Sequence, residues 1–554
     1  MSLAGTGKWF RAFLVHLAAI LAASLLFAAS FPNLLVEKGI PLLAWAAYIP
    51  VFWVIHRAKT GACIFWGALY GYTAYGLFNY WLSVFHPLAG LIVGTIYLVY
   101  FAVLFPVLKL ALLLFPKKGY LVQWVIWIAY EYLRTQGFLG YAYGITGYSQ
   151  WTVLPVLQIA SVFGVWGVSA LVVFPSAYIA GALGGLDFPP AQAAGGRTAA
   201  EGIRDFFRRE RVPAFLWLIA LAAVLVYGFA SPVDYSGAPK ANLALIQHNT
   251  DPWRGDMPQY RLNYQILKRL SLEALAADPK PDLVVWSETA FVPRIYWHTT
   301  YRTDPESYVL VKELLDFLSE QETPFLIGND DARRRVTPEG QWEQIDYNAA
   351  ILYDRGREAG IYRKLHLVPF TEWFPYEKLL PGIYQALRNA DTHFWEKGDE
   401  AVVFDIKGLK FSTPICFEDT FGYLSRNFVR NGAEIIVNIS NDAWSRSLPA
   451  QNQHLSMAVF RAVENRRSMV RSTASGQTCS IDPNGKVLAM AEPFTEAALT
   501  VEVPIHTGTT PYTRYGDFFA QLFLLAALII LLIGASRSIL FRIMYKKKEQ
   551  GTKL

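Results

Sequence analysis

The chain has 554 residues, of which 53% are hydrophobic and 15% aromatic, and its mean hydropathy is positive. This length is too great for one ordinary domain and this composition too apolar for a wholly soluble protein, so a membrane protein is expected. The formal net charge of +6 comes from basic residues in short segments beside apolar runs, which is typical of membrane topology signals and not of a nucleic-acid surface.

Apolar runs predict about eight membrane spans. A helix needs roughly 20 residues to cross a hydrocarbon core of about 30 Å. Runs of this kind lie near 10–32, 40–56, 62–84, 90–115, 152–185, 213–230 and 518–540, and a shorter one lies near 120–133. The first run is long and precedes further spans, which favours an anchor over a signal peptide. We therefore expect a polytopic α-helical membrane domain over 1–235 with seven spans, and an eighth span over 515–541.

Basic residues predict the orientation of these spans. With eight spans, the flanking basic residues all fall on one side, which is cytoplasmic by the positive-inside rule. They are Lys8, Arg11, Arg57, Lys59, Lys117, Lys118, Arg204, Arg208, Arg209, Arg211, Lys546, Lys547 and Lys548. With seven spans they would not share a side, which favours counting the short run. Segment 241–505 is then periplasmic in a bacterial inner membrane, and 542–554 is a basic cytoplasmic tail.

Segment 241–505 has the pattern of an α/β domain. Short β-branched runs alternate with helical stretches. The runs are 241–249, 282–288, 324–330, 348–354, 410–419, 433–442 and 498–504, and the helical stretches include 257–277, 305–320 and 450–467. Strands that alternate with helices and then return in hairpins predict an α/β sandwich.

Polar residues recur where the predicted strands end, at Glu288, Asn329, Cys416, Glu418 and Asn441. Ligands of α/β sheets bind at strand ends, because loops converge there on a rigid base. The chain has three cysteines, an odd number that excludes a disulfide framework, so any role of Cys416 is local. A cysteine after an apolar strand is usually buried and inert, whereas a reactive one needs a neighbouring base or cation.

Two kinds of partner are available for a reactive Cys416. His366 and His454 are candidates for a papain-like pair, but neither lies in a matching local pattern. Glu288 and Lys364 are better candidates. Each of them alone is also compatible with an ordinary role, as a helix cap, an ion-pair partner or a solvated charge.

Four motifs in order carry a resemblance to a known family: "WSETA" (286–290), "KLHLVPFTEWFP" (364–375), "PICFEDTF" (414–421) and "NISNDAW" (438–444). With them, and with spans on both sides, the chain resembles the apolipoprotein N-acyltransferases, membrane-embedded members of the nitrilase superfamily. The resemblance implies a nitrilase-like αββα sandwich with a catalytic triad of Glu288, Lys364 and Cys416. It also implies the reaction, in which a fatty acyl chain moves from a membrane phospholipid to the α-amino group of the diacylglyceryl-modified N-terminal cysteine of an apolipoprotein.

The chemistry of these three residue types fits that reaction. Glu288, desolvated by Trp286 and Phe291, is suited to take the thiol proton and later the proton of the attacking amine. Lys364 places positive charge where the oxyanion develops. Cys416 attacks the ester carbonyl and becomes a thioester, which splits one difficult transfer into two steps.

The resemblance extends to further residues. It implies that Glu372 and Glu418 orient Lys364, and that Trp253 lies in the substrate region, although Trp253 is equally compatible with an ordinary core position. Tyr143 is a weaker candidate for substrate contact, because the segment before "GYSQ" (147–150) departs from the family pattern. Phe417 also departs from it, since many members have Tyr there, so the ring is kept and the hydroxyl is absent.

The aromatic loop 370–396, which contains Trp373, is expected to be a mobile lid that dips into the bilayer surface. A small core under the loop is the alternative. No metal or cofactor motif and no nucleic-acid motif is present in the sequence. The expected partners are a phospholipid donor, the apolipoprotein acceptor and the bilayer, and the expected state is a monomer. A membrane-anchored nitrilase or amidase and a non-enzymatic scaffold are the alternative functions.

Overall fold

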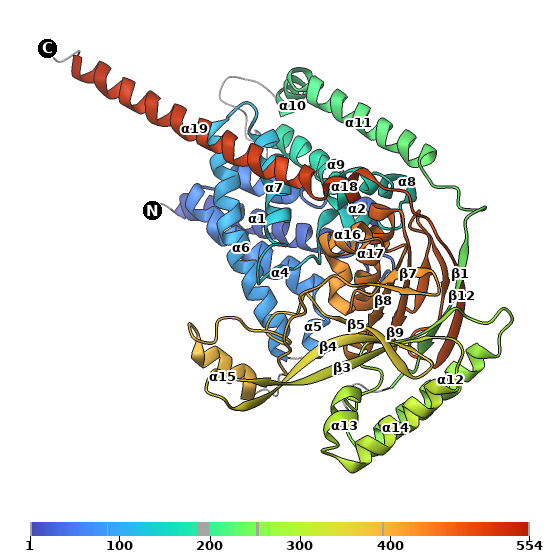
Figure 1. The fold of residues 1–554 in the computed structure, drawn as a ribbon. Coiled ribbons are helices and arrows are strands. Elements are labelled where there is room, and N and C mark those ends of the chain that lie inside the picture. Colours follow the sequence, from blue (N-terminus) through green and yellow to red (C-terminus); the bar gives the residue numbers. More distant parts are fainter. Residues whose placement is uncertain (1–2, 86, 185–198, 251–253, 390–392, 552–554) are drawn as a thin grey trace. The chain divides into compact units, whose positions relative to one another are not determined.

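The computed structural model describes residues 3–85, 87–184, 199–250, 254–389 and 393–551 (Figure 1). The chain forms two compact units. The helical unit comprises Met1–Ala230 and Asp517–Leu554, and the α/β unit comprises Ser231–Gly516.

The helical unit consists of helices joined by short turns. Its elements are α1 (Leu3–Ser30), α2 (Pro41–Ala44), α3 (Ile49–Arg57), α4 (Thr60–Phe78), α5 (Leu82–Phe85), α6 (Pro87–Leu114), α7 (Gly119–Leu133), η1 (Thr146–Gln150), α8 (Leu154–Leu157), α9 (Ala160–Leu183), α10 (Ala199–Arg209), α11 (Arg211–Ala230) and α19 (Phe518–Gly551). Among the described residues, five helices are long and apolar enough to cross a membrane: Trp9–Ser30, Ala89–Leu114, Ala160–Leu183, Arg211–Ala230 and Phe518–Leu540. The unit is therefore a membrane domain with several spans.

The other three predicted spans fall on shorter elements. The run 40–56 divides into α2 and the 9-residue α3, and the run 120–133 forms the 15-residue α7. The run 62–84 forms α4, which has 19 residues and ends at Phe78. The total of eight spans thus remains a prediction.

The α/β unit contains two six-stranded sheets, in the orders β12-β1-β2-β3-β4-β5 and β11-β10-β9-β8-β7-β6. The strands are β1 (Lys240–Gln247), β2 (Leu283–Trp286), β3 (Phe325–Val336), β4 (Trp342–Asp354), β5 (Arg357–Arg363), β6 (Val403–Ile406), β7 (Leu409–Ser412), β8 (Ile435–Ser440), β9 (Ser468–Thr473), β10 (Cys479–Ile481), β11 (Val487–Met490) and β12 (Ala497–Pro504). The helices are α12 (Met257–Leu275), α13 (Ile295–Tyr301), α14 (Pro305–Ser319), α15 (Pro381–Asn389), η2 (Cys416–Thr420), α16 (Gly422–Arg430), η3 (Asp442–Ser445), α17 (Leu448–Asn465) and α18 (Pro511–Tyr515).

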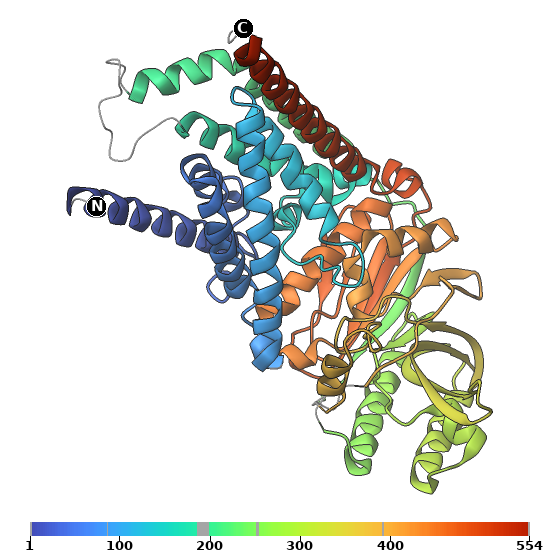
Figure 2. The same cartoon turned by 90° about the vertical axis from the view of Figure 1, so that its left-hand side faces the viewer.

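The two sheets share one pattern of pairing. The central strands are parallel, as in β1–β2, β2–β3, β7–β8 and β8–β9, while the outer strands pair antiparallel, all as hairpins except β1 with β12, which come from opposite ends of the unit. The central strands are fully buried and rich in Val and Ile, as expected for strands covered on both faces. The long β3–β4 hairpin, yellow in Figure 2, twists strongly along its length.

Helices cover the outer faces of the stacked sheets, with α12 and α14 on one side and α16 and α17 on the other (Figure 1). Apolar side chains of α12, α14 and strands β1 to β4 form one core cluster. Asp256 and Asp304 cap α12 and α14 by accepting from the backbone N–H three residues on. Between the sheets, the Ser472 hydroxyl donates to Val285 O. This arrangement is the predicted αββα sandwich.

Candidate active site

The three predicted catalytic residues lie at the ends of three strands of the α/β unit, and the fold brings them together. Glu288 follows β2, Lys364 follows β5, and Cys416 follows β7 and opens η2. Lys364 Nζ lies 3.4 Å from Glu288 Oε1. The charges of Glu288 and Lys364 both act on the Cys416 thiol.

The backbone turns sharply at two points of this site. Cys416 has φ 51° and Thr289, which follows Glu288, has φ 47°, so both lie in the left-handed region that non-glycine residues rarely occupy. Such strain is retained where the surroundings impose it, often at active sites. At Gly328 a Cβ atom would collide with the carbonyl oxygen of Ser287, so glycine lets β3 approach the Glu288 segment closely.

Glu288 is 7% exposed, and polar groups hold both of its oxygens. Oε1 accepts from Asn348 Nδ2 at 2.8 Å and from Lys364, and Oε2 accepts from the backbone N–H of Asn441 at 2.9 Å. Trp286 and Phe291, the expected apolar neighbours, both belong to the core cluster of α12 and α14. Asn348 opens the predicted run 348–354, but nothing in its spacing indicated this contact.

Lys364 is fully buried and its ammonium bridges two carboxylates. Nζ donates to Glu372 Oε1 at 2.8 Å as well as to Glu288. Burial opposes the charge, but Glu372 and Glu288 together outweigh it and raise the pKa of Lys364 above its usual range. Burial raises the pKa of Glu372, and the negative charge of Glu288 raises it further, while the Lys364 ammonium lowers it. The net shift is upward. Lys364 therefore stays an ammonium.

Glu418 is fully buried and fixes the backbone on two sides of the site. Its carboxylate accepts from the backbone N–H groups of Leu365, His366 and Ile415 at 2.7 to 2.9 Å, and from the Tyr362 hydroxyl at 2.8 Å. These hydrogen bonds hold the residues after Lys364 and before Cys416, rather than the Lys364 ammonium. Burial raises the pKa of Glu418 to about 7, against these hydrogen bonds.

The Cys416 side chain is partly exposed and its sulfur is protonated at neutral pH. Burial, followed by the Glu288 charge, raises the pKa of the Cys416 thiol well above its usual value, and Lys364 opposes this. A thiol in this state needs a base in order to react. Glu288 is the carboxylate placed to act as that base.

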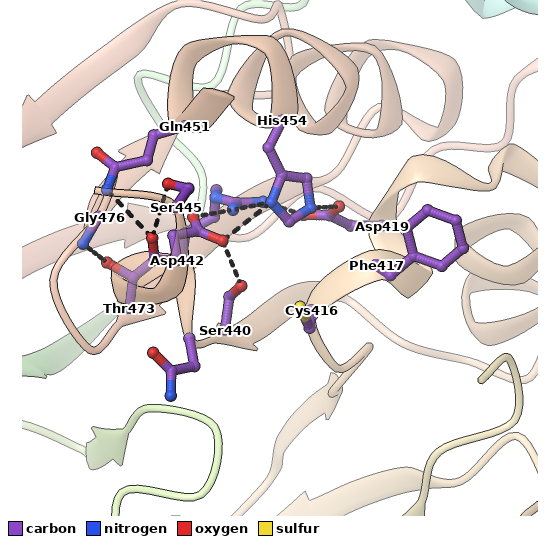
Figure 3. A network of polar contacts seen from close by, with 12 residues as sticks. Cys416, Phe417, Asp419, Ser440, Asp442, Ser445, Gln451, His454, Thr473 and Gly476 are labelled. Atoms are coloured by element: carbon purple, nitrogen blue, oxygen red, sulfur yellow. Dashed lines mark hydrogen bonds and ion pairs between the residues drawn. The ribbon is translucent and has the colours of Figure 1, made fainter. Parts of the chain in front are cut away.

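His454 occupies a buried quartet with Asp419, Asp442 and Arg471 (Figure 3). His454 Nε2 lies 2.6 Å from Asp419 Oδ1, and Nδ1 lies 3.1 Å from Asp442 Oδ1. Burial opposes its charge, but Asp419 and then Asp442 raise the pKa of His454 to about 9. An imidazolium cannot accept a proton, so this geometry argues against a papain-like Cys–His pair with His454.

His366 lies among aromatic rings instead. Its ring centroid is 3.9 Å from that of Phe421 and 5.8 Å from that of Phe417, and its Nδ1 lies 2.8 Å from the Tyr423 hydroxyl. Burial, with the charges of Lys397 and Lys364, lowers the pKa of His366 to about 4. Phe417 is buried in this cluster, so its ring has a packing role.

The loop 370–396 combines anchored and exposed side chains. Phe374 is buried, and Lys397 Nζ lies 3.5 Å from the ring centroid of Trp373. Tyr376, Leu379, Leu380 and Ile383 are exposed. The base of the loop is tied to the site, since Trp395 N–H donates to Glu372 O and Gly398 N–H to Lys364 O.

Two further residues, Trp253 and Tyr143, are predicted to contact substrate. Trp253 is outside the described residues. Tyr143 belongs to the helical unit, where it is buried and stacks on Tyr141. Its carbonyl oxygen accepts a hydrogen bond from Arg134 Nη1 at 2.9 Å. Substrate contact by either residue stays a prediction. Within the described residues, no group of three or more His, Cys, Asp or Glu side chains is placed to hold a metal ion.

The comparisons with known proteins decide the family. Residues 242–511 match the Carbon-nitrogen hydrolase family, and residues 23–178 match the Apolipoprotein N-acyltransferase N-terminal domain. Apolipoprotein N-acyltransferase 1 of Treponema denticola is 44% identical over 525 residues, which are 92% of this chain and 94% of the relative. The chain belongs to the apolipoprotein N-acyltransferase family.

Other relatives agree with this placement. Apolipoprotein N-acyltransferase 1 of Treponema pallidum is 45% identical over 552 residues, or 96% of this chain and 98% of the relative. Among solved structures, Saccharomyces cerevisiae Nit3, a member of branch 10 of the nitrilase superfamily, covers 48% of this chain and 90% of its own, with 20% identity and a TM-score of 0.34. The α/β unit of this family member is a carbon-nitrogen hydrolase domain by its match over residues 242–511.

Proposed function

We propose that this protein transfers a fatty acyl chain from a membrane phospholipid to the α-amino group of the diacylglyceryl-modified N-terminal cysteine of apolipoproteins. The observation that carries the proposal is the meeting of Glu288, Lys364 and Cys416 at the strand ends of a carbon-nitrogen hydrolase unit. The unit is joined to a helical unit in whose described residues five helices are long and apolar enough to cross a membrane, which suits a substrate drawn from the bilayer.

The residues act in two half-reactions. In the first, Glu288 takes the Cys416 proton, the sulfur bonds to the ester carbonyl carbon, and the ester C–O bond breaks as the leaving lysophospholipid oxygen takes that proton. In the second, the amine of the acceptor attacks the thioester, the C–S bond breaks, and Glu288 passes the amine proton to the departing sulfur, which restores the Cys416 thiol and the Glu288 carboxylate. The Lys364 ammonium stabilises the oxyanion in both steps, and Glu372 holds Lys364 in place.

Orientation and access follow from the same proposal. Eight spans place the basic loops in the cytoplasm and the α/β unit in the periplasm of a bacterial inner membrane. The exposed apolar side chains Tyr376, Leu379, Leu380 and Ile383 suit a lid that rests on the bilayer surface and admits lipid to a monomeric enzyme.

Intact-mass analysis of the purified protein incubated with phospholipid tests the proposal. The expected result is a mass increase of one fatty acyl chain that Cys416→Ala abolishes. The matched controls are Cys63→Ala and Cys479→Ala, which remove buried cysteines that the proposed mechanism does not use and should leave the increase unchanged. Acylation that persists in Cys416→Ala contradicts the mechanism.

The acceptor distinguishes this function from that of a membrane-anchored amidase. A lipopeptide with a free N-terminal amine should discharge the thioester far faster than water does. Rapid discharge by water alone, together with hydrolysis of a small amide, would favour the amidase.

A reporter active only in the cytoplasm, fused at Gly237, should be silent, and one fused at Glu201 should be active. The opposite pattern would contradict the periplasmic orientation.

A further inference from the structure

A buried ion pair joins β3 to the residue that precedes Lys364. Asp331 of β3 is fully buried, and its Oδ2 accepts from Arg363 Nε at 2.9 Å and from Arg363 Nη2 at 2.7 Å. Arg363 is the last residue of β5, which lies two strands away in the sheet. Its guanidinium crosses β4 over the ring of Tyr347, with 4.3 Å between the guanidinium carbon and the ring centroid. The mechanism above gives these residues no role.

Lys364 lies just beyond the paired part of β5. The register between β4 and β5 ends at Ala349 and Arg363. Beyond it, Lys364 N–H donates to Asn348 O at 2.9 Å, and Lys364 O accepts from Gly398 N–H at 2.9 Å. A Cβ atom at Gly398 would lie 2.2 Å from the Arg363 carbonyl oxygen, so this close approach needs glycine. The Arg363 side chain thus anchors the chain at the point where it leaves the sheet.

The Lys364 ammonium has to be placed accurately. Its Nζ lies 2.8 Å from Glu372 Oε1 and 3.4 Å from Glu288 Oε1. A lysine side chain is a flexible four-carbon stem, so its ammonium is placed well only when its backbone is also held. Misplacement of a catalytic group by about 1 Å can slow a reaction by about 10²-fold. The segment that carries Lys364 therefore benefits from an anchor that does not itself react.

The geometry of the ion pair suits an anchor. Two N–H groups of one planar guanidinium meet one buried carboxylate, which fixes direction as well as distance. The other oxygen of Asp331, Oδ1, accepts from Arg333 Nε at 2.8 Å, and the guanidinium carbon of Arg333 lies 3.3 Å from the ring centroid of Tyr296. Asp331 is thus held on two sides, and of these two arginines only Arg363 adjoins Lys364.

We propose that Arg363, bound by Asp331, is a positioning residue for acyl transfer, which fixes the end of β5 so that the Lys364 ammonium meets the oxyanion in both half-reactions. The inference rests on the role of Lys364 in the proposed function. The Arg363 guanidinium acts through the backbone of its neighbour and takes no part in proton transfer.

Arg363→Met and Arg333→Met form a matched pair of variants, because each removes one cation from Asp331 but only the first alters a neighbour of Lys364. In single-turnover intact-mass kinetics with phospholipid, Arg363→Met should form the acyl-enzyme about 10- to 10²-fold more slowly, and Arg333→Met should keep the parent rate. An ion pair that only stabilises the fold predicts similar slowing in both variants. Similar slowing, or a parent rate in Arg363→Met, would overturn the proposal.

A double-mutant cycle shows whether Arg363 acts through Lys364. In the Lys364→Met background the ammonium is absent, so Arg363→Met should cause no further slowing, whereas a general loss of stability would slow this background as well. Additive effects of the two substitutions would refute the inference.

Arg363→Lys covers the case in which Arg363→Met fails to fold. It keeps a cation beside Asp331 but lacks the planar guanidinium, so acyl-enzyme formation should slow by about three- to tenfold, the change that one net hydrogen bond brings. The parent rate in Arg363→Lys would then count against the proposal.

A measurement without phospholipid separates this inference from the proposed function. Burial and the Glu288 charge raise the pKa of the Cys416 thiol, and the Lys364 charge lowers it. A misplaced ammonium should therefore slow the alkylation of Cys416 by iodoacetamide, read by peptide mass mapping. At pH 8 we expect Arg363→Met to slow alkylation about threefold or more, in the same direction as Lys364→Met, and Arg333→Met to leave it unchanged.

The two readouts fail in different ways. An unchanged alkylation rate in Arg363→Met would contradict the inference even where acyl transfer is confirmed. Absence of acyl transfer in the parent protein would contradict the proposed function, and the alkylation rates would then decide the role of Arg363.

Discussion

Two buried charged clusters flank the same sulfur, and they differ in how their charges balance. In the quartet, two carboxylates face a guanidinium and an imidazolium, and each carboxylate has both oxygens engaged. In the acid–base cluster, the single ammonium of Lys364 lies between Glu288 and Glu372. The acid–base cluster thus carries excess negative charge, which favours the uptake of a proton. The charges of the quartet balance, so a further proton would not stabilise it. Charge balance distinguishes a scaffold from a reacting site here.

Removal of the base should give the largest effect. In Glu288→Gln the amide cannot take the thiol proton, so we expect acyl-enzyme formation to slow by about 10²- to 10⁴-fold. Single-turnover intact-mass kinetics with phospholipid measures the rate. Glu502→Gln, on an exposed strand position, is the matched control and should keep the parent rate. If Glu288→Gln formed the acyl-enzyme at the parent rate, another residue would have to be the base.

Removal of a cation from the quartet should instead act on folding. Arg471→Met leaves Asp419 and Asp442 buried with less compensation, and breaking such a buried pair costs about 3–5 kcal/mol of unfolding free energy. Denaturant unfolding in detergent measures the loss. Lys240→Met, which breaks an exposed ion pair with Glu502, should cost no more than about 1 kcal/mol. Equal losses in the two variants would mean that the quartet is no scaffold.

Lys364→Met tests the cation of the acid–base cluster. Loss of one oxyanion donor typically slows catalysis by about 10²- to 10³-fold, and both half-reactions should slow because each forms an oxyanion. Thioester formation and its discharge by a lipopeptide are measured separately. A defect confined to one half-reaction would argue against the shared oxyanion role.

The sequence predicted the acid–base cluster better than the quartet, for a physical reason. Glu288 and Cys416 each lie at the end of an apolar β-run, and a strand end is visible in local spacing, whereas Lys364 was found through the resemblance of its motif to the family. The quartet joins positions 419, 442, 454 and 471 through side chains that meet only after two sheets have stacked, so no spacing reveals it. His454 therefore remained a candidate base, although its two nitrogens are held by carboxylates.

The fold shows the same limit. Hydropathy located five long apolar helices, and β-branched runs located the sandwich. The run 40–56 was predicted as one span but contains two helices, because Pro50 lies in the first turn of α3, where proline favours a new helix start. The partner of Glu288 in β4, Asn348, was missed because its contact joins residues 60 apart.

A pH dependence should separate the clusters further. His454 has a folded pKa of about 9, above its unfolded value near 6.5, so its charged contacts stabilise fully below about pH 6.5 and are lost as pH rises through 9. The unfolding temperature should therefore fall between pH 7 and pH 9. His454→Gln should flatten this fall while Asp419, Asp442 and Arg471 remain. If the unfolding temperature of His454→Gln fell as steeply between pH 7 and pH 9 as that of the parent, other groups would be responsible for the fall.

The smallest effect is expected at Glu418, which shares the η2 turn with Cys416 and Asp419 but faces the Lys364 loop rather than the quartet. In Glu418→Gln, an amide N–H replaces one of the oxygens that accept from backbone N–H groups, so donor faces donor. We expect this to lower the free energy of unfolding by about 1–3 kcal/mol. The parent carboxyl has a folded pKa of about 7, above its unfolded value, so the parent loses stability as pH rises from about 4.3 to 7, whereas the amide does not titrate. The deficit of the variant should thus be larger at pH 5 than at pH 8, measured as the difference in unfolding temperature. A deficit that grows with pH would mean that the charged form of Glu418 is the stabilising one, and that its four hydrogen-bond donors outweigh its burial.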